Sequence, residues 1–131
     1  MGKVIEKIRL TSLFDSTKSI EVEAIIDTGA TMMVLPQNLV DELELRRIRE
    51  TTVKYANGQR QKRSIYAGLV VELKGRVGNF ETVAEAIESD ALVGQVVLEG
   101  LDLVVDPRTR TLLPNPMSPE MPMVEILMAT V

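Results

Sequence analysis

Alternating apolar and polar residues predict that most of this chain forms β-strands. Residues 3–10 and 18–26 alternate or run apolar with valine and isoleucine, and the FDSTKS segment between them has the composition of a turn. The second strand ends at Asp27, and Gly29 then interrupts the pattern. The start of the chain therefore predicts two strands joined by a turn, with an aspartate directly after the second strand.

The next apolar run predicts a short strand and then a helix. Residues 32–35 are apolar, and Pro36 suits the first turn of a helix that continues through QNLVDELEL. Leu39, Val40 and Leu43 would share one face of this helix, because residues three and four positions apart are neighbours on a helix surface. We expect that face to pack against the strands.

A long hairpin is the natural interpretation of residues 51–73. Its turn would be the Asn-Gly pair at 57–58, because Asn-Gly favours a tight turn in which both residues have positive φ. Lys74-Gly75 and Gly78-Asn79 predict further turns, and the NFETVAEAI segment is expected to form another strand.

The late part of the chain, ALVGQVVLEGLDLVVD, predicts an apolar strand, a glycine, a helical turn near 96–98 and a second apolar strand. TRTLLP would be the last strand of a domain spanning residues 1–114. Residues 115–131 hold three of the six prolines and end in MVEILMATV. Because proline cannot continue a central strand, we interpret this tail as a linker to a terminal strand that caps the sheet or pairs with another chain.

The amino-acid composition excludes several kinds of catalytic site and partner. The chain has 131 residues, 45% of them hydrophobic, and a net charge of −4 without a continuous basic stripe, so it has the size of one domain and no nucleic-acid footprint. It contains neither cysteine nor histidine, which excludes disulfides, thiol nucleophiles, Ser-His-Asp triads and most zinc sites. Hydrolytic chemistry would have to use carboxylates, lysine or an all-oxygen metal site.

The N-terminal segment does not have the pattern of a signal peptide. Lys3, Glu6, Lys7 and Arg9 stand where its apolar region would have to be. No apolar run approaches the roughly 18 residues that span a bilayer. A cytoplasmic protein without a membrane or nucleic-acid partner is the expectation.

Two motifs resemble the retropepsin-like aspartic proteases. The segment AIIDTGATMMVLP, residues 24–36, is similar to their active-site segment: two apolar residues, Asp-Thr-Gly-Ala, and an apolar run ending in Val-Leu-Pro. Leu92-Val93-Gly94 is similar to the family's later mark, an apolar pair followed by glycine and a helical turn. The resemblance covers roughly residues 5–114. It implies an all-β acid-protease fold, a closed barrel with one short α-helix, assembled as a two-fold symmetric homodimer.

The resemblance makes Asp27 the catalytic residue, and physical chemistry explains its neighbours. A carboxylate at the end of a buried strand needs hydrogen-bond donors, and the amide of Gly29 is well placed to supply one. In the resembled family, the threonine at the position of Thr28 bonds across to the partner's loop and locks the two aspartates in register. Ala30 lacks the hydroxyl that would favour ionisation of the aspartates, so we expect a less acidic pH optimum than that of pepsin-like enzymes.

Further site residues follow from the same resemblance. Substrate and flap contacts are assigned to Thr31, Met32, Tyr55, Ala56, Asn57 and Gly58, and support of the active-site loop to Leu92, Val93 and Gly94. Many retroviral relatives carry acidic residues where this chain has Thr31 and Met32, so its substrate contacts should differ. The flap, around KYANGQRQ, is also richer in charge and poorer in glycine than retroviral flaps.

Peptide hydrolysis by carboxylates requires two of them, one ionised to activate water and one protonated to donate to the carbonyl oxygen. The nearest second motif, Asp15-Ser16-Thr17, lacks the glycine and the aliphatic lead-in. The expected enzyme is therefore a homodimer in which Asp27 and its copy activate water against a peptide or protein substrate, with no cofactor and no metal.

Two other functions stay open at this point. The chain could be a retropepsin-like dimeric binding module without catalysis. IIDTGAT also looks like the first phosphate-binding loop of the actin-like ATPase fold, although that fold needs far more chain than 131 residues. Asp27 could alternatively cap a turn with no catalytic role.

Overall fold

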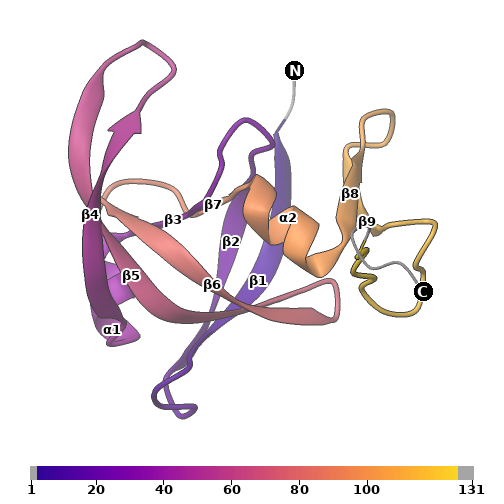
Figure 1. Cartoon of the computed structure of the whole chain (residues 1–131), viewed down its shortest axis with the longest axis horizontal. Helices are drawn as coiled ribbons and strands as arrows, with labels where there is room; N and C mark the ends of the chain where they lie inside the picture. The colour runs from indigo at the N-terminus through magenta and orange to yellow at the C-terminus, as the bar shows by residue number, and fades with distance from the viewer. Residues whose placement is uncertain (1–2, 127–131) are drawn as a thin grey trace.

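The computed structural model describes residues 3–126, and strands dominate it (Figure 1). The elements in chain order are β1 (Val4–Ser12), β2 (Ser19–Ile26), β3 (Met33–Pro36), α1 (Gln37–Glu42), β4 (Arg46–Lys54), β5 (Arg60–Leu73), β6 (Arg76–Glu85), β7 (Leu92–Val93), α2 (Gln95–Leu101), β8 (Leu103–Asp106) and β9 (Thr111–Pro114). The mostly β class predicted from the alternating pattern is confirmed. The helical turn expected near 96–98 is a full short helix, α2.

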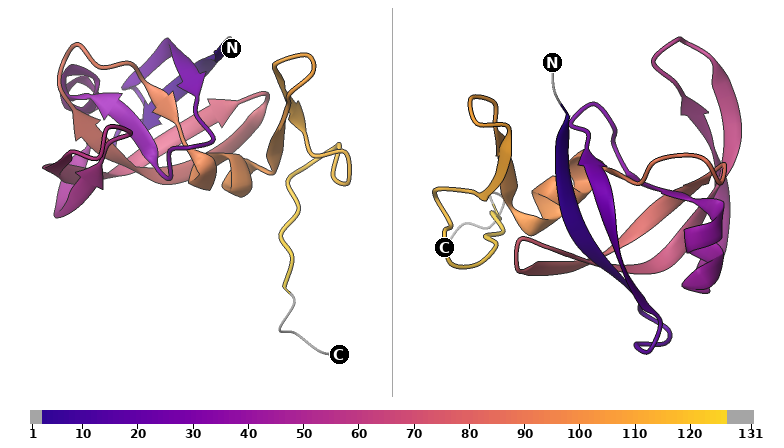
Figure 2. Two further views of the ribbon diagram at one scale, coloured as in Figure 1. Left: turned by 90° about the horizontal axis from the view of Figure 1, so that it is seen from above. Right: turned by 180° about the vertical axis from the view of Figure 1, so that it is seen from behind.

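Seven strands form one sheet in the order β1-β2-β7-β3-β6-β5-β4. β1 also pairs with β5, through residues 9–12 and 69–72, so β1 has a partner on both sides. β8 and β9 form a separate two-stranded sheet that stands to one side of the main sheet in Figures 1 and 2. The short β7 lies between β2 and β3, which brings the late motif beside the residues that flank Asp27.

One hydrophobic core lies inside the seven-stranded sheet. Alternate residues of β1, such as Ile8 and Leu10, point inward and are buried, as the period of two predicts. α1 covers the core with Val40, and Leu43, the residue directly after this helix, is also buried. α2 adds three further buried residues. The predicted helical face is therefore the buried face, but α1 ends at Glu42 and does not continue through residue 45. The reason is local: Glu44 takes a left-handed conformation, with φ of 51°, and turns the chain into β4.

The turn predicted at residues 78–79 is wrong, because both residues lie inside β6. Gly78 faces Val71 of β5 across the ladder, and a side chain on Gly78 would meet the Phe80 ring at 2.7 Å. This glycine makes room for an aromatic ring and does not turn the chain. The tight turn is at Lys74-Gly75, where both residues have positive φ, 53° and 76°.

The long hairpin is confirmed, but its turn differs from the prediction. Gly58 has a φ of 85°, whereas Asn57 does not have positive φ. The Gly58 amide donates to the carbonyl of Tyr55 at 2.9 Å, and the Asn57 side chain accepts from the amide of Gln59 at 2.9 Å. The turn therefore contains four residues, with glycine at its one left-handed position. β4 also begins earlier than expected, at Arg46.

The segment after β9 folds back against the main body. Asn115 and Ser118 both donate side-chain hydrogen bonds to the Asp102 carboxylate, and the buried Arg76 donates to the carbonyl of Ser118. Residues 122–126 form no strand in this single chain, and the rest of the predicted terminal strand, residues 127–131, lies outside the described residues. The division at residue 114 stays a prediction. No helix within residues 3–126 has the length and apolar character needed to cross a bilayer.

Candidate active site

Asp27 begins a tight loop at the end of β2. Its amide donates to the Val93 carbonyl at 2.9 Å, and its own carbonyl accepts from the Ala30 amide at 3.1 Å, so the backbone is held on both sides. The Gly29 amide donates to Asp27 Oδ1 at 2.9 Å, which confirms the predicted hydrogen bond. A side chain on Gly29 would place its Cβ 3.3 Å from that same oxygen, so glycine leaves the carboxylate accessible.

The late glycine motif supports this loop from beneath. Gly94 lies so close to the loop that a Cβ on it would be 2.3 Å from the carbonyl oxygen of Met32. The first two amides of α2, those of Gln95 and Val96, donate to the carbonyls of Ala30 and Thr31 at 2.7 and 2.9 Å. Helix amides without intrahelical partners are thus satisfied by the active-site loop. The close approach of Gly94 to Met32 is consistent with the predicted support of the active-site loop.

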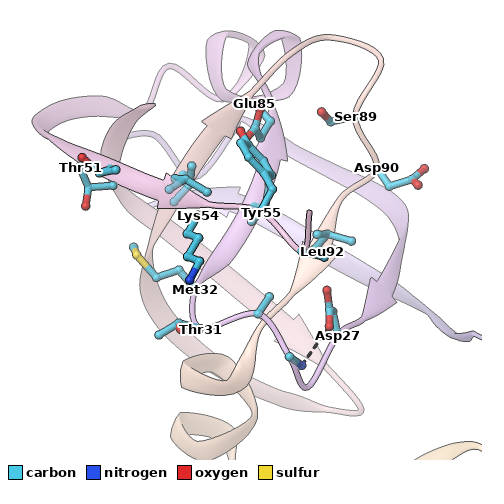
Figure 3. A pocket seen from close by; sticks show the side chains of 17 residues that line it. Asp27, Thr31, Met32, Thr51, Lys54, Tyr55, Glu85, Ser89, Asp90 and Leu92 are labelled. Atoms are coloured by element: carbon cyan, nitrogen blue, oxygen red, sulfur yellow. Dashed lines mark hydrogen bonds between the residues drawn. The ribbon is translucent and has the colours of Figure 1, made fainter. Parts of the chain in front are cut away.

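A cleft of about 890 Å³ lies between this loop and the β4–β5 hairpin (Figure 3). Eight of the predicted site residues line it: Asp27, Gly29, Ala30, Thr31, Met32, Tyr55, Ala56 and Leu92. Five others do not: Thr28 is exposed within the loop, Asn57 and Gly58 form the hairpin tip, and Val93 and Gly94 are buried below. Met32 and Val34 make part of its wall apolar.

Several lining residues escaped the sequence interpretation. They are Thr51, Thr52, Val53 and Lys54 on β4, Val83 and Glu85 on β6, and Ser89 and Asp90 in the loop before β7. A strand pattern shows which residues share a face but not what that face covers, because the covering element comes from elsewhere in the chain. Only the β4 residues could have been found from the sequence, because they come directly before the predicted flap turn.

One charged cluster borders the cleft. The Tyr55 hydroxyl and Arg63 both donate to Glu85, the latter at 2.9 Å from Nε to Oε1. Burial raises the pKa of Glu85, but the hydrogen bonds from Tyr55 and Arg63 outweigh it, so its pKa lies below the ordinary glutamate value. Burial, together with the hydrogen bond to Glu85, raises the pKa of Tyr55. Tyr55 therefore binds a wall of the cleft in the free protein (Figure 3).

The fold and the site together have the features of an aspartyl protease domain: a mostly β sheet, an Asp-Thr-Gly loop and a hairpin over a cleft. A comparison with protein families matches residues 17–102 to the family described as gag-polyprotein putative aspartyl protease. The match covers more than half of the chain, and the chain belongs to this family. A search of curated proteins found no match. The family assignment confirms the retropepsin-like resemblance and disfavours the phosphate-loop alternative.

Proposed function

We propose that this protein is an aspartic endopeptidase in which Asp27 and its copy in a second chain activate water across a homodimer. The observation that carries the proposal is the position of the Asp27 loop. This carboxylate lines a cleft large enough for several peptide side chains, directly opposite the hairpin that would cover a bound substrate.

A second carboxylate is required, and this chain offers no good candidate within residues 3–126. Glu85 and Asp90 are the other acidic residues that line the cleft. Both oxygens of Glu85 accept hydrogen bonds from Tyr55 and Arg63, so that group is already engaged. Asp90 is exposed in the loop before β7 and is turned away from Asp27 in Figure 3. A second copy of Asp27, related by a two-fold axis, supplies the missing group without any new motif.

The two-stranded sheet β8–β9 is the surface we assign to dimerisation. Val104 and Leu113 pair across this sheet, share its outward face and are 38% and 40% exposed. The inner face of this sheet packs Leu103 and Leu112 into the core. Contact with a second copy would remove the apolar side chains on the outer face from water. We also propose that the main sheet is a closed barrel, which the second pairing of β1 with β5 supports.

The chemistry follows from two carboxylates that share one proton. The ionised Asp27 takes a proton from water, and the water oxygen attacks the peptide carbonyl carbon. The protonated Asp27 of the other copy donates its proton to the carbonyl oxygen, which gives a tetrahedral diol without a covalent enzyme intermediate. Collapse of the diol with protonation of the leaving nitrogen releases two peptides and regenerates the pair.

Incubation with a mixed peptide library tests the proposal. Wild-type protein should cleave, Asp27→Asn should not, and a statine-type inhibitor such as pepstatin should block cleavage. Asp15→Asn is the matched control, because Asp15 belongs to the other Asp-hydroxyl segment and lies on an exposed turn. Excess Asp27→Asn chain should also suppress wild-type activity, since mixed dimers hold only one aspartate at the site.

Three outcomes would contradict the proposed function. A wild-type dimer that cleaves nothing over a broad pH range, yet still binds peptides, would be a binding module. Activity that survives in Asp27→Asn would remove Asp27 from the mechanism. Activity insensitive to excess Asp27→Asn chain would contradict the shared site.

A further inference from the structure

The outer part of the β4–β5 hairpin, residues 50–64, projects beyond the main sheet, and we name it the flap arm. β4 pairs only with β5, and β6 pairs with β5 only from Ile65 onward. The strands of the flap arm are therefore held by ladder bonds to each other and not to the sheet. The position of this arm over the cleft must be set by side chains.

Within residues 3–126, two side-chain hydrogen bonds connect the flap arm to β6, and both end on Glu85. One more, from Arg47 Nε to Ser64 Oγ at 2.8 Å, joins the two strands of the hairpin to each other at the base of the arm. Tyr55, at the base of the turn, donates its hydroxyl to Oε2, and Arg63, on the opposite strand, donates Nε to Oε1 at 2.9 Å. Glu85 is the last residue of β6, and its side chain is 11% exposed. One carboxylate on the fixed wall thus binds both strands of the projecting arm.

The chemistry of this contact suits a firm attachment. Hydrogen bonds to an ionised group are stronger than those between neutral groups, and here both oxygens of one carboxylate are used. Hydrogen bonds from Tyr55 and Arg63 keep the pKa of Glu85 below its ordinary value despite burial, so the group stays ionised in weak acid. Tyr55 and Glu85 also line the cleft, so the attachment lies beside the position of a bound peptide.

We propose that Glu85, Tyr55 and Arg63 form a latch that fixes the flap arm over the cleft and thereby sets how tightly a peptide is held. These are positioning residues, not catalytic ones, because they act through the flap. The part of the proposal that concerns peptides rests on the proposed protease function. The part that concerns the flap position does not.

The flap position can be measured without any activity. The chain has no cysteine, so Gln59→Cys at the hairpin and Glu99→Cys on α2 give two unique nitroxide labels on exposed positions. Electron spin distance measurements, with labelled chain diluted in unlabelled chain, should show one narrow distribution. Tyr55→Phe and Glu85→Gln should each broaden it. Tyr66→Phe is the control, because its hydroxyl binds Gln37, outside the flap arm.

Kinetics test the consequence. If wild-type protein cleaves a peptide, the two latch variants should raise KM about tenfold with kcat changed less than about threefold, because flap closure holds the substrate while Asp27 is untouched. Unchanged distance distributions in both folded latch variants would overturn the latch. A broadened flap without a rise in KM would overturn its role in peptide binding. Failure of wild-type protein to cleave would refute the protease proposal and leave the distance result to decide the latch.

Discussion

The backbone of Gly94 touches the backbone of Met32: a Cβ on Gly94 would lie 2.3 Å from the Met32 carbonyl oxygen and 2.8 Å from its amide nitrogen. Gly94 has extended backbone angles, φ −92° and ψ −179°, that any residue adopts. The requirement for glycine is therefore one of space and not of conformation. This close contact connects the late Leu92-Val93-Gly94 motif to the loop that carries Asp27.

Gly94→Ala should displace the active-site loop. We expect a loss of about 1–3 kcal/mol in the free energy of unfolding, the usual cost of overpacking. We also expect at least a hundredfold loss of kcat/KM, because small displacements of reacting groups are costly. Gly75→Ala is the control: its left-handed φ costs roughly 1–2 kcal/mol, but it lies on the β5–β6 turn away from the cleft. Equal loss of activity in both variants would mean that stability alone explains the effect.

Ala30→Ser should move the pH optimum of cleavage toward acid. Ala30 lines the cleft beside Asp27, and a hydroxyl there could donate to a carboxylate oxygen and favour its ionised form. The pH-rate profile of kcat/KM measures the shift, with Thr31→Ser as a control that changes a hydroxyl residue without adding a donor. Coincident profiles for wild type and Ala30→Ser would contradict the proposed effect of Ala30.

Asp102 should make the free energy of unfolding depend on pH between about 4 and about 2. Side-chain hydrogen bonds from Ser118 and Asn115, with one from the Met123 amide, lower the pKa of Asp102 from 3.8 to about 2. Because the folded-state pKa is depressed, its stabilisation is present above the unfolded pKa and is lost as pH falls toward about 2. Asp102→Asn keeps the left-handed backbone, which asparagine tolerates, but loses the charge.

Thermal unfolding of wild type and Asp102→Asn should differ most near neutral pH. The gap should narrow as pH falls from about 4 to about 2, since wild-type Asp102 then becomes neutral as well. Hydrogen exchange of residues 115–123 should also be faster in the variant at neutral pH. A gap in melting temperature that is constant across this pH range would show that the charge of Asp102 is not what anchors the segment.

Arg76→Met should destabilise the fold without touching the cleft. Arg76 is 6% exposed and donates to the carbonyls of Leu101, Asp102 and Ser118. Removal of the donor leaves buried carbonyls unpaired, with an expected loss of about 2–4 kcal/mol in the free energy of unfolding. Arg60→Met, on the exposed end of β5, should change it by less than about 0.5 kcal/mol. Urea unfolding compares them, and similar stabilities would contradict the assigned role.

Val104→Lys should weaken dimerisation if β8–β9 forms the interface. A charge on the outward apolar face would have to be buried without a partner, which is costly. Sedimentation velocity should show more monomer, and activity should fall with dilution at higher concentrations than for wild type. Val77→Lys, on β6 and 57% exposed, is the matched control. A tight dimer in Val104→Lys would place the interface elsewhere.

The alternation of apolar and polar residues predicted the strands well. It predicted the role of a single residue poorly where that role depends on a contact with another side chain. β1, β2 and β9 follow their predicted ranges within about two residues. Gly78 was misinterpreted as a turn because glycine marks turns in general. Its role depends on the Phe80 ring, whose position relative to the glycine no local pattern shows. The Asn57-Gly58 pair marked the hairpin correctly but not its turn type.

Some residues of the candidate site could be recognised from the sequence, and others could not. Residues 27–32 and 92–94 were recognised because each stretch is contiguous and carries its motif in a few adjacent residues. The β4 and β6 walls were missed because their residues are far apart in the chain and share no motif. Glu85, which holds both Tyr55 and Arg63, has no sequence signal at all, since its partners lie 30 and 22 positions earlier.

The sequence by itself determined the mostly β character, the Asp27 loop with its Gly29 donor, and the family, because these depend on residue order over short distances. Only the tertiary structure decided that the Met32 backbone is what Gly94 leaves room for, that Glu85 binds the flap arm, and that Asp102 and Arg76 hold the segment after β9. The physical reason is that these contacts join residues brought together by strand pairing. Their energies depend on distances and burial that the order of residues along the chain does not contain.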